Sequence, residues 1–172
     1  MTRIITASRT ISRATSRATS RAISVAISVA VSLGALASFS AAAVAQQGPQ
    51  KLPATRLSIG MHAIQAEVAK SPQEHGIGLM FRPSMPTNDG MLFIFEQSGK
   101  QCFWMKNTLL PLSVAFIADD GAITNIEAMK PQTLDAHCST RQVRYVLEMN
   151  DGWFAKRGIK PGMKIQGAPF GR

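Results

Sequence analysis

The sequence predicts a mainly β protein, built as a single sandwich or barrel with one or two short helices. Short apolar segments recur along the chain, and turn-forming residues such as Asn88-Asp89-Gly90 separate them. Few stretches show helical periodicity. Many short strands with few helical residues are typical of a sandwich or barrel rather than of βαβ units. The length of 172 residues allows one domain.

Residues 1–45 resemble a secretory signal peptide. An arginine-rich, acid-free stretch ends at Arg21, and an uncharged run then leads to Ala43-Val44-Ala45. This order matches a positive region, an apolar region and an A-x-A cleavage site. We expect cleavage after Ala45 and a periplasmic or otherwise exported product.

Two alternatives remain for this segment. A transmembrane anchor needs about 20 mainly apolar residues, and five serines dilute the run: Ser24, Ser28, Ser32, Ser38 and Ser40. A mitochondrial presequence is also rich in Arg and Ser, but the A-x-A site favours secretion. The processed protein is therefore not expected to span a membrane.

The remaining chain divides into a flexible lead-in (46–56), a β-rich domain (57–168) and a short tail (169–172). Ile64, Ala66 and Val68 alternate with more polar neighbours, which predicts a half-buried strand. The clearest hairpin joins 112–118 to 122–128 across Asp119-Asp120-Gly121.

Further strands are expected over 91–95, 102–105, 143–149 and 163–166, and a long loop over 129–141. Ser71-Pro72-Gln73-Glu74 predicts a helix start with a capping box, and Gly76 and Gly78 keep the helix short. Asp151 is expected to cap a single turn through 153–155.

Two cysteines, Cys102 and Cys138, are predicted to form a disulfide, because an even count in an oxidising compartment favours pairing. The alternative is a thiolate metal site that includes His137. Soft Cu(I) ligation by methionines is a further possibility, but their spacing is irregular. Neither a metal nor a cofactor is expected.

Charge and motifs exclude several functions. From residue 46 onward, 14 basic residues face 10 acidic ones, which is too even for a nucleic-acid footprint. Phosphate loops, nucleophile elbows and zinc motifs are missing from the sequence. This favours a protein without catalytic activity of its own.

Four residues are candidate ligand contacts. Arg82 and Lys106 would supply charge, Asn107 would orient the ligand, and Trp104 would form a stacking wall. The structural alternatives for Arg82 are an ion pair with Glu74 or Glu148, or hydrogen bonds to loop carbonyls. For Lys106 and Asn107 the alternative is a solvated strand end, and for Trp104 it is core packing. Glu148 is a weak candidate acid or base, and a surface or ion-pair carboxylate is the alternative.

The chain resembles the bacterial and archaeal "domain of unknown function 192" family over roughly residues 57–167. Five motifs carry the resemblance: Glu74-x-x-x-Gly78-Leu79-Met80-Phe81-Arg82, Gly90-Met91-Leu92-Phe93-x-Phe95, Phe103-Trp104-Met105-Lys106-Asn107-Thr108-x-x-Pro111-Leu112, Tyr145-x-Leu147-Glu148 and Gly158-Ile159-x-x-Gly162. The resemblance implies export and a compact jelly-roll-like or barrel fold, but no reaction. Ser113 departs from the family, whose members often carry Asp there.

Three functions follow as hypotheses. The first is an exported β-domain that binds a small polar or anionic ligand or an envelope protein. The second is an enzyme acting on an envelope carbohydrate or other small molecule, with Glu148 as acid or base. The third is an accessory factor of envelope assembly, recognised through an exposed apolar patch.

Overall fold

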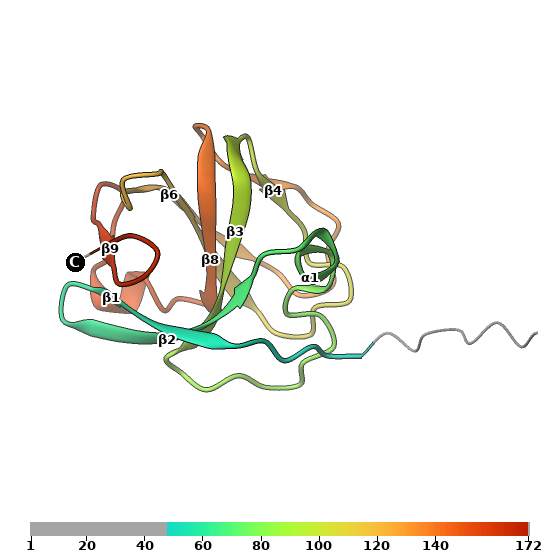
Figure 1. Ribbon diagram of the computed structural model, residues 1–172. Coiled ribbons are helices and arrows are strands. Elements are labelled where there is room, and N and C mark those ends of the chain that lie inside the picture. Colours follow the sequence, from blue (N-terminus) through green and yellow to red (C-terminus); the bar gives the residue numbers. More distant parts are fainter. Residues whose placement is uncertain (1–47, 172) are drawn as a thin grey trace, which may run out of the picture. The chain divides into compact units, whose positions relative to one another are not determined.

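The structure is a computed structural model that describes residues 48–171 (Figure 1). The signal peptide expected over residues 1–45 lies outside this range. Within 48–171, no helix is long and apolar enough to cross a membrane.

The described chain is mainly β, as predicted. Its nine strands are β1 (Ala54–Ile59), β2 (His62–Ala69), β3 (Asp89–Gly99), β4 (Cys102–Phe103), β5 (Leu112–Ile117), β6 (Ile123–Met129), β7 (His137–Cys138), β8 (Val143–Asn150) and β9 (Ile165–Gln166). An α-helix, α1 (Pro72–Ile77), and a 3-10 turn, η1 (Ala155–Arg157), complete the elements.

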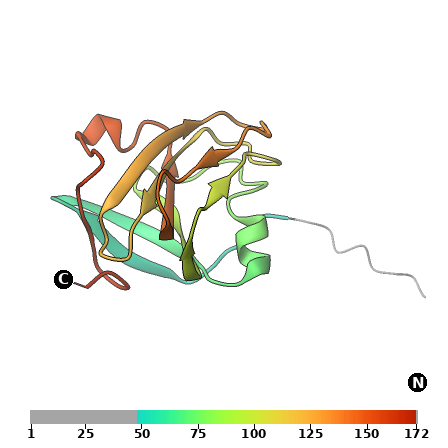
Figure 2. The ribbon, with the colours of Figure 1, turned by 90° about the horizontal axis from the view of Figure 1, so that it is seen from above.

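Seven strands form one curled sheet in the order β6-β5-β8-β3-β2-β1-β9 (Figures 1 and 2). The predicted hairpin is confirmed, because β5 and β6 pair antiparallel with Val114 opposite Glu127. β8 lies between β3 and β5 at the centre of the sheet.

One pair of strands is joined as in a βαβ unit, whereas the sequence favoured a sandwich or barrel without such units. β2 and β3 run parallel, and the connection between them contains α1. A parallel pair needs a crossover of about a dozen residues or more, and the segment 70–88 supplies it. This crossover places α1 beside one face of the sheet (Figure 2).

The two edges of the sheet meet at one end, which gives the sheet a barrel-like closure. Ile123 donates its N–H to the Met163 carbonyl at 2.9 Å, and Ile165 donates to the Gly121 carbonyl at 3.0 Å. Ala122 and Lys164 form an antiparallel bridge between them. These bonds pair backbone groups that an open sheet leaves unsatisfied.

Strand alternation creates two cores, one on each face of the sheet. On β8, Leu147 and Met149 enter the first core, together with Trp153 and Phe154. Val146 faces the opposite side and joins the second core. Because successive side chains point to opposite faces, each central strand contributes to both cores.

The predicted capping box of α1 is confirmed. The Ser71 hydroxyl accepts from the Glu74 N–H, and the Glu74 carboxylate accepts from the Ser71 N–H at 2.8 Å. The helix ends at Ile77, as short as expected, with Gly78 as its C-cap.

Several element bounds differ from the predictions. The strand expected over 102–105 covers only 102–103, and the loop expected over 129–141 contains β7, which pairs with β4. The single helical turn is the 3-10 turn 155–157, and Asp151 does not cap it. Asp151 instead accepts a hydrogen bond of 3.0 Å from the buried hydroxyl of Ser113.

The predicted disulfide is confirmed. Cys102 and Cys138 are bonded, with their Cα atoms 4.1 Å apart, and the bond ties β4 to β7. Because both thiols are consumed, the alternative thiolate metal site is wrong. His137 lies 2.9 Å from a Glu127 carboxylate oxygen instead, measured from its Nδ1.

Candidate functional site

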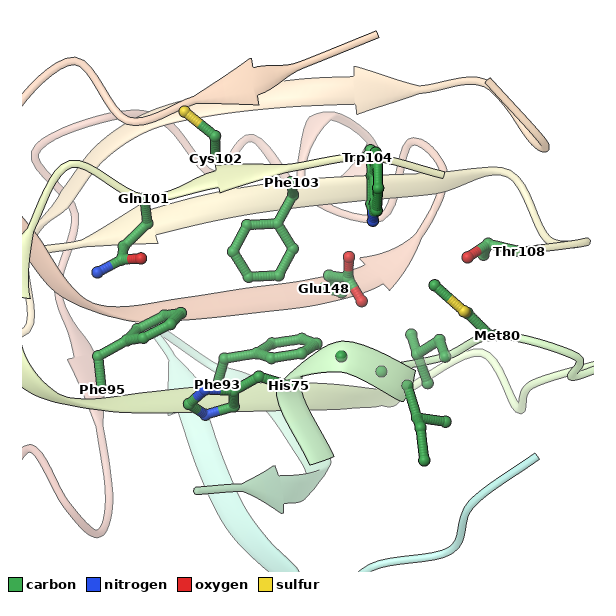
Figure 3. Close-up of a pocket in the computed structure, with 14 residues that line it drawn as sticks. His75, Met80, Phe93, Phe95, Gln101, Cys102, Phe103, Trp104, Thr108 and Glu148 are labelled. Carbon is green, nitrogen blue, oxygen red and sulfur yellow. The ribbon is translucent and has the colours of Figure 1, made fainter. Parts of the chain in front are cut away.

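A cavity of about 280 Å³ lies on the second-core side of the sheet, between α1, β3, β8 and β4 (Figure 3). Strand β3 and Glu148 of β8 form its floor, and α1 with the residues after it forms one wall. Its lining is predominantly apolar and aromatic: His75, Gly76, Ile77, Gly78, Leu79, Met80, Phe93, Phe95, Gln101, Cys102, Phe103, Trp104, Thr108 and Glu148. Apolar concave sites with few polar groups are typical of small-molecule binding.

Glu148 is the one carboxylic acid in this lining. In the sheet it lies between Met91 of β3 and Val114 of β5, and only 4% of its surface is exposed. Across residues 48–171, no hydrogen bond to its carboxyl group is found. Burial therefore raises the pKa of Glu148 to about 8. At neutral pH the free protein carries a protonated carboxylic acid here.

Gly90 makes this position of Glu148 possible. A side chain at Gly90 would collide with the carbonyl oxygen of Glu148 and with the sulfur of Met149. Glycine allows β3 and β8 to approach each other closely where Glu148 projects from the sheet.

Aromatic rings form the wall opposite α1. Phe103 packs edge-on against Phe93, with ring centroids 4.8 Å apart, and against Phe95 at 6.5 Å. Trp104 follows at the open side, where 52% of its surface is exposed. Figure 3 shows its indole nitrogen directed toward the Glu148 carboxyl group. The cavity thus combines π-faces with a single buried acid.

Of the predicted site residues, Trp104 and Glu148 lie together in this cavity. The expectation of core packing for Trp104 is wrong, since about half of the residue's surface is exposed. The expectation of a surface or ion-pair carboxylate for Glu148 is also wrong. Its strand occupies the sheet centre, and no cation lies within ion-pair distance in the described residues.

Lys106 and Asn107 follow Trp104 at the rim and are not among the lining residues. The Lys106 ammonium lies 5.6 Å from the Trp104 ring centroid. Asn107 has a φ of 56°, a left-handed conformation that asparagine tolerates better than most residues. Its carbonyl accepts a 2.9 Å hydrogen bond from the Phe81 N–H, which links this loop to the chain after α1.

Arg82 is not among the lining residues, and its side chain pairs with Glu67, at 2.7 Å, rather than with Glu74 or Glu148. It also donates to the Gln50 carbonyl at 2.6 Å, while the Glu67 carboxylate accepts from the Leu52 N–H at 2.7 Å. Gln50 in turn donates to the carbonyls of Glu74 and Gly78 at the end of α1. Arg82 therefore connects the lead-in to the body of the domain.

Sequence reasoning missed the contributions of Phe93, Phe95 and Thr108 to the cavity. The signal for the two phenylalanines was present, because Met91, Phe93 and Phe95 alternate on β3. Their strand face is the face of Glu148, but only the pairing of β3 with β8 shows this.

Among the described residues, no group of three or more His, Cys, Asp or Glu side chains gathers. Methionines are similarly dispersed: Met61 is 91% exposed at the β1–β2 turn, whereas Met80 lines the cavity.

The fold and the site together define a small curled-sheet domain with a lateral cavity and a buried acid. The chain belongs to the "domain of unknown function 192" family, described as "Uncharacterized ACR", whose profile matches residues 55–167. No curated protein matches the chain.

The chain is similar to several solved structures, including the following two. One is a protein from Sinorhizobium meliloti 1021 that carries the provisional name of a transcription regulator. It has 37% identity and a TM-score of 0.66, and the match covers 70% of this chain and 98% of that one. The other is a protein of unknown function from Novosphingobium aromaticivorans DSM 12444. It has 32% identity and a TM-score of 0.65, with 67% and 86% of the two chains covered.

Proposed function

We propose that this protein is an exported binding domain whose cavity at Glu148 takes a small organic ligand. The observation that carries the proposal is the buried carboxyl group of Glu148, which lies at the floor of an aromatic cavity and has no hydrogen-bond partner within residues 48–171. Buried polar groups are almost always hydrogen-bonded, so a ligand that supplies the missing partner would be favoured. Export is supported by the Cys102–Cys138 disulfide, which is typical of oxidising compartments.

The residues that line the cavity favour one class of ligand over another. An anionic ligand was expected to meet Arg82 and Lys106, but the cavity lining contains no arginine or lysine. Arg82 is already engaged by Glu67. We therefore favour a polar ligand with an apolar body over an anionic one.

A fragment screen by NMR would test this function. We expect the fragments that bind to shift the indole resonance of Trp104 and the amide of Thr108. Trp104→Ala should weaken their binding, while Met61→Ala, which removes a side chain that is 91% exposed and is not among the lining residues, should leave it unchanged. Binding that ignores Trp104 would overturn the proposal.

A second candidate is an enzyme that uses Glu148 as a general acid. A pKa near 8 suits proton transfer close to neutral pH, and perturbed carboxyl groups in clefts are frequent at active sites. Glycoside hydrolysis is disfavoured, because that chemistry commonly needs two carboxyl groups and the lining has one. A pH–rate profile that persists unchanged in Glu148→Gln would remove Glu148 from this role.

The envelope-partner hypothesis has one observation in its favour. Trp104, Leu109 and Leu134 are large apolar side chains with 47–66% of their surfaces exposed. Their loops are linked by a 3.0 Å hydrogen bond from the Met105 N–H to the Thr133 carbonyl. This hypothesis predicts co-purification with a larger complex that is lost in Leu134→Ser.

A further inference from the structure

We propose that the cavity selects organic ammonium cations, with the Glu148 carboxylate as counter-charge and the rings of Phe103 and Trp104 as the surrounding wall. This inference rests on the proposed binding function and names the ligand class of the same site. Three observations support it: the cavity lining offers Glu148 no lysine or arginine, aromatic rings form the wall, and the Glu148 carboxyl group holds a proton that a cation can displace.

Glu148 has no lysine or arginine among the residues that line the cavity with it. The elements packed against it present Met91 from β3, Val114 from β5, His75 from α1, and Trp104 and Thr108 from the chain after β4.

His75 is the one other titratable group in the cavity lining. Its Nε2 lies 3.1 Å from the Ala69 carbonyl, and its ring packs against Phe95 with centroids 4.6 Å apart. His75 is therefore engaged at the α1 side. A buried carboxylate needs a paired charge, and a bound cation would supply it.

The aromatic wall favours the same ligand charge. The face of an aromatic ring carries negative electrostatic potential and attracts cations, most strongly for tryptophan. Trp104 already attracts one, since the Lys106 ammonium lies 5.6 Å from its ring. An anionic ligand would meet the π-faces of these rings unfavourably.

Cation binding would displace one proton. In the free protein the proton is held on the Glu148 carboxyl group, and binding of the ammonium ion leaves a carboxylate while the proton passes to the solvent. Burial supports this coupling, because it raises the pKa of Glu148 to about 8. Affinity should therefore rise with pH until the free carboxyl group ionises, and level off above that point.

The test compares choline with 3,3-dimethylbutan-1-ol, two probes of nearly the same shape that differ in charge. Calorimetric titration of the disulfide-bonded protein at pH 6, 7 and 8.5 should show choline binding at least about tenfold tighter than the alcohol at pH 8.5. Below the Glu148 pKa, choline affinity should gain up to about tenfold per pH unit, with proton release detected by comparing buffers of different ionisation enthalpy.

Three variants assign the effect. Glu148→Gln should abolish both the charge preference and the pH dependence, with its fold checked by its thermal transition. His75→Gln should keep both. Lys106→Ala should leave choline binding unchanged or tighten it, because it removes a competing cation, whereas a site for anions would lose affinity.

The outcomes separate the two proposals. If the alcohol binds as tightly as choline at each pH, or if affinity falls as pH rises, the cation inference is wrong and the binding function stands. If neither probe binds, the cation inference is overturned. If no fragment of the NMR screen reaches the cavity either, the binding function fails with it.

Discussion

Glu148 shows how the position of one residue in a sheet determines its chemistry. A carboxylate at a strand end is solvated and acidic, but on the central strand β8 the same group is buried between neighbouring strands. The fold tolerates this buried carboxyl group because its proton stays bound. The protein thereby retains a group whose charge responds to pH or to a ligand.

We predict that wild-type stability falls relative to Glu148→Gln as the pH rises. The folded state holds the proton up to pH about 8, whereas the unfolded chain releases it near its ordinary value of 4.5. Between these values each pH unit favours the unfolded state, for a total on the order of 5 kcal/mol. Urea unfolding of both proteins at pH 4.5 and 9 measures the difference. A constant difference between the two proteins would contradict the burial argument.

Arg82 shows the opposite effect on a carboxyl group, because it helps to lower the pKa of Glu67, whereas burial raises the pKa of Glu148. Burial raises the pKa of Glu67, but hydrogen bonds from Arg82 and the Leu52 N–H, together with the Arg82 charge, bring it below its ordinary value. We expect Arg82→Ala to lower the free energy of unfolding by about 2 kcal/mol, because charged hydrogen bonds are lost.

This loss should have its own pH dependence. The loss should have its full size at pH 7, because the pKa of Glu67 in the folded state lies below its ordinary value of 4.5. It should shrink as the pH falls below 4.5 and through this lower pKa, where Glu67 becomes protonated in both states. The exposed Arg141→Ala is the matched control, and equal effects of the two substitutions would refute the structural role of Arg82.

At the scale of elements, α1 and β4 determine the shape of the cavity. The helix is short, lacks a buried residue of its own, and is held by its capping box and by Gln50. Strand β4 has only two residues and depends on its pairing with β7. The cavity walls thus rest on local hydrogen bonds and one disulfide rather than on long elements.

Two glycines in and after α1 should respond oppositely to alanine. Gly76 has ordinary helical geometry and open space around an added methyl group, so Gly76→Ala should stabilise the protein by up to about 1 kcal/mol. Gly78 has a φ of +49°, and an added methyl group would lie 3.3 Å from the Phe93 ring. Gly78→Ala should therefore cost about 1–3 kcal/mol. Thermal unfolding measures both, and effects of the same sign would contradict the conformation at the end of α1.

For the described domain as a whole, the sheet separates two cores that are stabilised differently. The first core is enclosed by the curled sheet, whose edges are joined by the bonds between 121–123 and 162–165. The second core is covered by α1, by the β4–β7 pair and by loops. The disulfide spans 36 positions and lies on this second side.

We predict that the double variant Cys102→Ser, Cys138→Ser loosens the second core first. On the chain-entropy description, loss of the bridge costs about 3–4 kcal/mol. Hydrogen exchange should accelerate at Gln101 and Ser139, which flank the bridge and are joined by backbone hydrogen bonding, while Leu147 and Ile165 keep most of their protection. Uniform acceleration across the domain would mean that the two cores unfold as one unit.

The sequence by itself determined the features that depend on neighbouring residues. The capping box of Ser71 and Glu74, the 112–128 hairpin and the mainly β class follow from local turn and capping chemistry, which acts over a few residues. The disulfide also followed, because only two cysteines were available to pair.

The tertiary structure alone decided which distant residues meet. The sequence predicted that Arg82, Trp104, Lys106 and Asn107 form one binding group. In the structure Arg82 pairs with Glu67, and Trp104 lines a cavity together with Glu148, which lies on β8. The parallel pairing of β2 with β3 and the central place of β8 arise from long-range strand order. The burial of a side chain depends on the strands that lie on both sides of its own strand, and the protonation of Glu148 depends on that burial. The local sequence does not show which strands these neighbours are.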